Sequence, residues 1–284
     1  MYEGLNVIVF IPVYNPSEDF YIKTIPLLKS QSVRHKLYLI SSSGDIDVKD
    51  SMIEVIDKID FSHSNTRNSV LKYDADFYLF MTQDAVAYDN NLIENLLDSF
   101  KDSEAVVSYA RQVPNLDASP SEKFARETNY PENSSIKSLE DISKYGIKTF
   151  FSSNSCAMYR GDYFRKMKGF ALNLNTSEDM EVAARAVLDG YKIAYNSNAK
   201  VYHSHNYTLK SLYARYKAIG LFFHQNRWIL DAANKHHNIE KTGFTQVVKE
   251  IKHILVTKPS YLPLSLSQIA VKYIAYKIGI KGNK

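Results

Sequence analysis

The chain has 284 residues, of which 45% are hydrophobic and 23% charged, the balance of an ordinary soluble globular protein. Cys156 is the single cysteine, which excludes a disulfide within the chain and is typical of a reducing compartment. The apolar run from Leu5 to Val13 is short and contains Asn6, so it predicts a first strand and not a signal peptide. Because no stretch reaches the roughly 18 apolar residues of a membrane span, we expect a cytoplasmic protein unless it attaches peripherally to a membrane.

Charge is distributed unevenly along the chain. Residues 1–208 contain 22 Lys/Arg and 28 Asp/Glu, whereas residues 209–284 contain 13 Lys/Arg and 3 Asp/Glu. This asymmetry predicts an acidic body that carries a basic extension, which meets something anionic. We therefore expect two domains, the body over 1–208 and a helical, basic extension over 209–284.

Short apolar runs alternate with helical stretches in the first half of the chain. The runs predict buried strands, and the stretches between them have helical spacing, including Met52, Val55, Ile56 and Ile59. Such alternation predicts an α/β fold with a mainly parallel sheet. The expected strands are 7–11, 37–40, 76–81 and 105–109, and the expected helices are 17–30 and 92–100.

A polar segment follows at 112–148, which predicts a long excursion on the binding face of the sheet. Beyond residue 208 the sequence is helical and basic. The elements expected between these two segments are a strand at 149–151, helices at 162–168 and 181–188, and strands at 191–195 and 200–205.

In sheets of this kind, ligands bind outside the carboxyl ends of the strands. The polar groups at those ends are Tyr14-Asn15, the loop from Ser41 to Asp45, and Gln83-Asp84. A carboxylate such as Asp84 at a strand's end is well placed to hold a divalent metal over a diphosphate. Its position fits a turn or helix-capping residue equally well.

Two further groups of residues can carry chemistry. Glu178 and Asp179 begin a predicted helix, where they serve either as capping acids or as a general base. His203 and His205 flank one residue of a predicted strand, so their side chains share a face and can bind a metal or phosphate, or simply pack. Arg67 has two functional interpretations, pairing with a phosphate or fixing an acidic loop, besides that of a surface residue.

Taken together, these segments resemble glycosyltransferase family 2, which has the GT-A fold, across about residues 5–225. No single motif is specific, but their order and spacing are, and several are closest to the rhamnosyltransferase subgroup. The segments that carry the resemblance are Val9 to Asn15, Thr66-Arg67-Asn68, Phe80 to Ala85, Ser177 to Met180, Gly190 to Tyr195 and His203 to Tyr207.

The resemblance implies a Rossmann-like GT-A domain and an inverting, metal-dependent sugar transfer. In this scheme Asp179 is the general base that takes the proton from the acceptor hydroxyl. Asp84, with His203 or His205, would hold Mg²⁺ or Mn²⁺ against the leaving diphosphate. The donor nucleotide would lie against Pro12, Tyr14, Asn15, Arg67, Asn68 and Gln83.

The rhamnosyltransferase subgroup implies dTDP-L-rhamnose as the donor and a growing, often lipid-linked, cell-surface polysaccharide as the acceptor. A UDP-sugar is the alternative donor. The family usually has an Asp after the second strand that reads the base, whereas this chain has Ser41-Ser42-Ser43, which leaves Asp45 as the substitute.

Two other classes of protein share this fold. A nucleotidyltransferase needs a glycine-rich phosphate loop after the first strand, and Pro12 to Ser17 contains no glycine. A non-catalytic nucleotide-sugar-binding protein would lack the base, and Asp179 is present.

The extension is expected to dock on an anionic membrane surface, at the inner face of the cell membrane, and no nucleic acid is expected as a partner. Its apolar residues repeat at helical spacing beside lysines. The alternative is a helix packed on the catalytic domain with its basic face in solvent. The apolar residues are Leu266, Ile269, Tyr273 and Ile280, and the lysines are Lys272, Lys277, Lys281 and Lys284.

Overall fold

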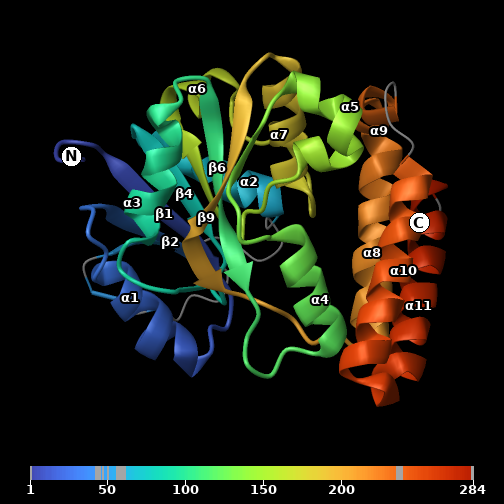
Figure 1. Ribbon diagram of the computed structural model, residues 1–284. Coiled ribbons are helices and arrows are strands. Elements are labelled where there is room, and N and C mark those ends of the chain that lie inside the picture. The colour runs from blue at the N-terminus through green and yellow to red at the C-terminus, as the bar shows by residue number, and fades with distance from the viewer. Residues whose placement is uncertain are drawn as a thin grey trace. The chain divides into compact units, whose positions relative to one another are not determined.

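The computed structural model describes residues 2–41, 46, 48, 49, 51–55, 62–234 and 239–282, with the backbone alone at 53–55 and 239–242. The chain forms two compact units (Figure 1). The first contains Met1–Val113, Pro131–Leu139 and Phe150–His203, and the second contains Pro114–Tyr130, Glu140–Thr149 and Ser204–Lys284. The division thus falls at His203, near the expected boundary at 208, but two parts of the polar excursion belong with the C-terminal helices.

In the part of the chain that the structure describes, a nine-stranded sheet forms the centre of the first unit, in the order β3-β2-β1-β4-β8-β6-β9-β5, with β7 paired to β9. Strands β3, β2, β1 and β4 are parallel, β6 is parallel to β9, and β8 runs antiparallel between β4 and β6. This confirms the α/β class. The strands are β1 (Val7–Val13), β2 (Lys36–Ser41), β3 (Ser51–Val55), β4 (Phe77–Met81), β5 (Val86–Ala87), β6 (Ala105–Val113), β7 (Ser135–Lys137), β8 (Cys156–Arg160) and β9 (Lys192–Tyr202).

The apolar composition of β1 and β4 explains their central position. Six of the seven residues of β1 and all five of β4 are buried, because helices and loops cover both faces of the sheet. The helices of this unit are α1 (Ile25–Lys29), α2 (His63–Asn68), α3 (Leu92–Asp98), α6 (Gly161–Lys166) and α7 (Glu178–Leu188). A π-helical segment lies at Phe20–Thr24, and 3₁₀ turns lie at Ser69–Lys72 and Ser99–Lys101.

The strand directions bring the ends of several strands to one edge of the sheet. The carboxyl end of β4 lies beside the amino end of the antiparallel β8, because Met81 pairs with Cys156. The carboxyl ends of β6 and β9 lie at this edge too, because Val113 pairs with Tyr202. The residues that follow β1, β4 and β9, and those that precede β8, therefore share the edge at which ligands bind in such sheets.

Three expected elements differ from the structure. The helix expected from the spacing of Met52 and Val55 is wrong at those residues, because Ser51–Val55 is a strand and its pairing with β2 overrides the local helical spacing. Residues 56–60 lie outside the described part. Residues 146–150 form a 3₁₀ turn instead of leading into a strand at 149–151. The two strands expected at 191–195 and 200–205 are one strand, β9, with a bulge stabilised by hydrogen bonds to the Asn196 side chain.

The second unit is helical. Among its helices, α8 and α11 run side by side (Figure 1) and meet through two glycines. A Cβ on Gly220 would lie 2.4 Å from the Tyr276 carbonyl oxygen, and one on Gly279 would lie 2.1 Å from that of Lys217, so only glycine allows this approach. The helices are α4 (Pro120–Asn129), α5 (Ile142–Tyr145), α8 (Leu209–Gln225), α9 (Arg227–Asn234), α10 (Ile239–Thr257) and α11 (Leu262–Ile280), with 3₁₀ turns at Leu139–Asp141 and Pro259–Tyr261. Within the described residues, no helix combines the length and apolarity required to cross a membrane.

Candidate functional site

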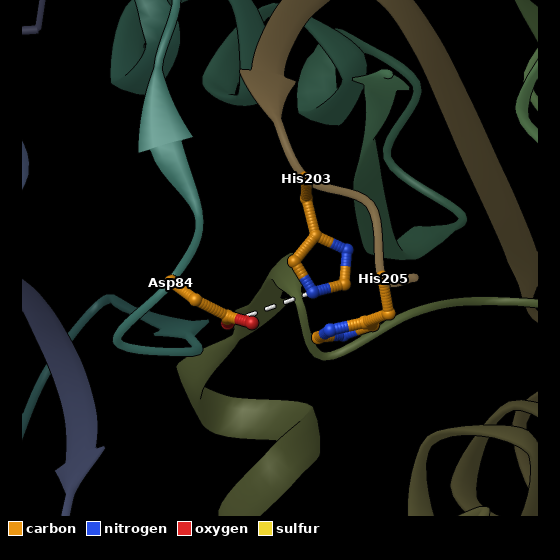
Figure 2. A group of neighbouring side chains, drawn as sticks. All are labelled: Asp84, His203 and His205. Atoms are coloured by element: carbon orange, nitrogen blue, oxygen red, sulfur yellow. Dashed lines mark ion pairs between the residues drawn. The ribbon is translucent and has the colours of Figure 1, made fainter. Parts of the chain in front are cut away.

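Asp84, His203 and His205 form a group that can hold a metal ion. Asp84 lies in the turn between β4 and β5, and the two histidines lie in the segment that follows β9. The Asp84 carboxylate is 3.5 Å from His203 Nε2, and one ligand atom from each of the three residues lies within 4.8 Å of the others. Figure 2 shows both rings beside the carboxylate. They do not share the face of a strand, as the sequence analysis expected, because β9 ends at Tyr202 and both histidines lie beyond it.

The donor atoms of this group suit a divalent transition metal. One carboxylate oxygen and two imidazole nitrogens make a mixed set, whereas Mg²⁺ in proteins keeps oxygen ligands and water. The Asp84 side chain is 46% exposed and that of His203 is 7% exposed, so the group is open on the aspartate side. Such a site leaves positions for oxygen atoms of a ligand.

Glu178 and Asp179 begin α7 and follow a strained residue, Ser177, whose φ is +60°. Glu178 is buried, and its carboxylate lies 3.3 Å from Arg67 Nη1 and accepts a hydrogen bond from Asn154 Nδ2 at 3.0 Å. Burial alone would raise the pKa of Glu178, but the charges of Arg67 and His63 and the Asn154 hydrogen bond outweigh it and lower that pKa. Glu178 is therefore an ionised partner of a buried arginine.

Asp179 has a different environment, although it is the next residue. One carboxylate oxygen accepts from the Asn154 amide at 3.0 Å, and the other accepts from the Met180 amide at 2.8 Å. Burial, and then the negative charge of Glu178, raise the pKa of Asp179 to about 6, against the two backbone hydrogen bonds. A carboxylate with a pKa just below neutral is ionised at pH 7 and is more basic than a free aspartate.

Helix α2 holds the segment that leads into this acidic pair. The Asn68 side chain both donates to the Phe170 carbonyl at 2.8 Å and accepts from its amide at 2.9 Å. Asn65 makes the same kind of reciprocal pair with Asn173. Arg67 forms an ion pair with Glu178, so three side chains of α2 contact the segment 170–178.

That Arg67 and Asn68 bind the donor nucleotide stays a prediction, because in this structure both side chains contact the protein itself. Arg67 is 3% exposed, and its guanidinium is occupied by Glu178 and by the His63 carbonyl at 3.1 Å. It matches the other interpretation offered by the sequence, that of fixing an acidic segment. Asn68 acts on the same segment through the Phe170 backbone.

The remaining expected nucleotide contacts lie around the end of β1. Pro12 is within β1, in register with Ile40, and Tyr14 follows the strand with 44% of its surface exposed. Gln83 accepts from the Tyr14 amide at 2.7 Å and donates to the Tyr14 carbonyl at 3.0 Å, so it supports this turn. Asn15 has a φ of +41° and is exposed. The other loop expected here, at 42–45, lies outside the described residues.

Sequence reasoning missed two residues that organise the site, Gln112 and Asn154. Asn154 holds both acids of the pair, and its own side-chain oxygen accepts from the Tyr159 hydroxyl at 2.8 Å. Gln112 contacts His203. The polar run Ser152-Ser153-Asn154-Ser155 before a buried strand was the available signal for Asn154, because it lies at the ligand-binding edge.

An α/β sheet with a candidate metal group and an acidic pair at one edge is the arrangement expected of a glycosyltransferase of the GT-A type. Residues 117–274 match a family model described as glycosyl transferase family group 2. The O-antigen chain rhamnosyltransferase RfbN of Salmonella typhimurium is 36% identical over 97% of this chain and 90% of its own length. WbaN of Salmonella anatum, with the same description, is 35% identical over 95% and 88%. The chain belongs to glycosyltransferase family 2, as its motifs predicted, and is similar to rhamnosyltransferases.

Solved structures share the fold. A mannosyltransferase from Pyrobaculum calidifontis, in complex with GDP-mannose and Mn²⁺, superposes with a TM-score of 0.66 at 12% identity, over 98% of this chain and 88% of its own. TarS residues 1–349 from S. aureus, in complex with UDP, gives 0.55 at 14% identity, over 98% and 91%. At these identities the likeness confirms the GT-A fold alone.

Proposed function

We propose that this glycosyltransferase moves L-rhamnose from dTDP-L-rhamnose to a cell-surface polysaccharide acceptor, with inversion at the anomeric carbon. The observation that carries the proposal is the similarity to two O-antigen chain rhamnosyltransferases over nearly the whole of both chains. The acceptor is expected to be a lipid-linked glycan.

A transfer assay tests this proposal. Purified protein is incubated with Mn²⁺, a membrane fraction that contains lipid-linked acceptors, and labelled dTDP-L-rhamnose or labelled UDP-sugars in parallel. Incorporation from dTDP-L-rhamnose supports the proposal, whereas incorporation from a UDP-sugar alone overturns the assignment of the donor. Binding of the nucleotide sugar without transfer or hydrolysis would instead indicate a non-catalytic binding protein.

In the proposed mechanism, Asp179 accepts the proton of the acceptor hydroxyl. The acceptor oxygen forms a bond to the anomeric carbon while the bond to the diphosphate oxygen breaks on the opposite face, which inverts the configuration. Tyr14 would stack on the nucleoside from the exposed end of β1, where its ring is accessible. A divalent cation held by Asp84, His203 and His205 would neutralise the charge of the leaving diphosphate.

We expect Asp84→Asn to abolish metal-dependent donor binding, because Asn keeps the shape of the side chain but lacks the negative charge that attracts the cation. Calorimetric titration of dTDP-L-rhamnose with and without Mn²⁺ measures the effect, and affinity in Mn²⁺ should fall to the metal-free value. Asp74→Asn, near the other end of β4 with its side chain 90% exposed, is the matched control. Unchanged donor affinity in Asp84→Asn would show that Asp84 does not hold the metal.

We also infer that the second unit contacts an anionic membrane. The end of α10, the following turn and the start of α11 expose apolar side chains, including Val256, which is 84% exposed. Lys252 and Lys258 are exposed here, and residues 252–267 contain no acidic side chain. Each lysine near anionic lipid contributes about 1 kcal/mol, and an inserted apolar side chain adds to this. The exposed apolar residues are Leu255, Val256, Leu264 and Leu266.

Flotation with liposomes decides this point. At low salt the protein should float with anionic liposomes and not with neutral ones, and the double change Leu255→Asp with Val256→Asp should weaken flotation. Leu188→Asp, at an exposed leucine of the first unit, is the control that should float normally. Failure of the unaltered protein to bind anionic liposomes at low salt would leave the alternative, a basic helical surface that faces solvent.

A further inference from the structure

The His203 ring contacts a buried glutamine on the side that faces away from Asp84. Gln112 lies near the end of β6, is 2% exposed, and is paired in register with Val201 of β9. Its side-chain oxygen is 2.9 Å from His203 Nδ1. The backbone of the same segment is fixed as well, because the His203 amide donates to the Val113 carbonyl at 3.0 Å.

This contact determines which ring nitrogen can bind a metal. An amide oxygen only accepts hydrogen bonds, so Nδ1 of His203 carries the hydrogen and donates it to Gln112. In the neutral ring the lone pair is then on Nε2, the nitrogen that lies 3.5 Å from the Asp84 carboxylate. Metal-binding histidines are commonly oriented in this way by an acceptor on their other nitrogen.

The other end of Gln112 is anchored to the segment that holds the acidic pair. Gln112 Nε2 donates to Ser153 Oγ at 2.9 Å. On either side of Ser153, the Ser152 hydroxyl donates to the Asp179 carbonyl at 3.0 Å, and the Asn154 amide donates to the Asp179 carboxylate at 3.0 Å. The residues before β8 therefore support the histidine of the metal group and the acids of α7 together.

We infer that Gln112 is a positioning residue of the metal site: it fixes the tautomer and orientation of His203, and Ser153 in turn fixes Gln112. This inference rests on the proposed role of His203 as a metal ligand. Loss of such an outer hydrogen bond typically lowers metal affinity about 10- to 100-fold, which is large enough to measure directly.

The test is Mn²⁺ binding to the full-length protein without donor, followed by electron paramagnetic resonance of the free ion. Gln112→Leu removes the acceptor and should weaken binding about 10- to 100-fold. Gln112→Glu should bind Mn²⁺ at least as well as the unaltered protein, because a carboxylate still accepts from Nδ1 and the Ser153 hydroxyl can turn to donate to it. Gln225→Leu, at an exposed glutamine of α8, is the matched control and should have no effect.

A double-mutant cycle separates positioning from general damage to the fold. His203→Ala should weaken Mn²⁺ binding, and Gln112→Leu added to it should cause no further loss, because its effect passes through His203. An equal loss in the His203→Ala background would overturn the inference, and so would normal binding in Gln112→Leu alone. If Gln112→Leu does not fold, Ser153→Ala replaces it in the cycle, with a smaller expected loss. Normal Mn²⁺ binding in His203→Ala would contradict the metal site itself, and with it this inference.

Discussion

Asp179→Asn is expected to lower the turnover number at least 100-fold while donor affinity stays nearly unchanged. General base catalysis typically contributes about 10²–10⁴-fold in rate, and an amide cannot accept the proton of the acceptor hydroxyl. Asn keeps the size of the side chain, and its oxygen can still accept from the Asn154 or Met180 amide. The measurement is the initial rate of sugar transfer at saturating donor, with calorimetry for donor affinity.

The pH dependence of the unaltered enzyme provides a second measurement of the same base. Because the pKa of Asp179 is about 6, the carboxylate is ionised above this pH and protonated below it. Turnover should therefore be constant above about pH 7 and fall about tenfold per unit well below pH 6. A profile that stays flat down to pH 4 would contradict the assignment.

Glu178→Gln is the informative companion change. It removes the neighbouring negative charge that helps to raise the pKa of Asp179, so the acidic limb of the profile should shift to lower pH. Activity at pH 7 should remain. If Glu178→Gln abolishes transfer and Asp179→Asn does not, the base is Glu178.

The part of this site that the sequence predicts is the part formed by local patterns. Apolar runs fix the buried strands, and strand direction places Asp84 and His203 at one edge. Adjacent acids at the start of a helix mark Glu178 and Asp179 as candidates. Only the environment, an arginine beside one acid and two backbone amides at the other, distinguishes their roles.

The part that could not be predicted depends on contacts between distant segments. Arg67 reaches Glu178 across 111 residues of sequence, and Asn68 reaches Phe170 across 102. The sequence around an arginine in a helix near the expected nucleotide site does not distinguish an arginine that binds phosphate from one that binds a carboxylate. Gln112 likewise gains its role from His203, which a strand pairing brings beside it. Local spacing also failed at β3, where pairing with β2 decides the structure.

The buried ion pair between Arg67 and Glu178 leads to the largest expected effect on stability. Arg67→Met should lower the free energy of unfolding by about 3–5 kcal/mol, because it leaves a carboxylate that is 4% exposed without its counter-charge. Chemical denaturation at pH 7 measures the change. Arg34→Met, at an exposed arginine, is the matched control and should change stability by less than about 0.5 kcal/mol.

Two results would show that charge, and not packing, causes this loss. In the unaltered protein the pKa of Glu178 is lowered, so the stabilisation is present above the ordinary carboxyl pKa and is lost as the pH falls through the lowered one. In Arg67→Met the arginine charge no longer offsets burial, so the pKa of Glu178 should rise. The difference in free energy of unfolding between the two proteins should therefore become smaller in acid. At pH 7, adding Glu178→Gln to Arg67→Met should recover part of the stability, because a neutral amide is less costly to bury than an unpaired carboxylate. A difference in free energy of unfolding that is independent of pH, with no recovery in the double variant, would mean that Arg67 acts through the packing of its hydrocarbon chain. Asn65 and Asn68 would then hold the segment 170–178 without help from the ion pair.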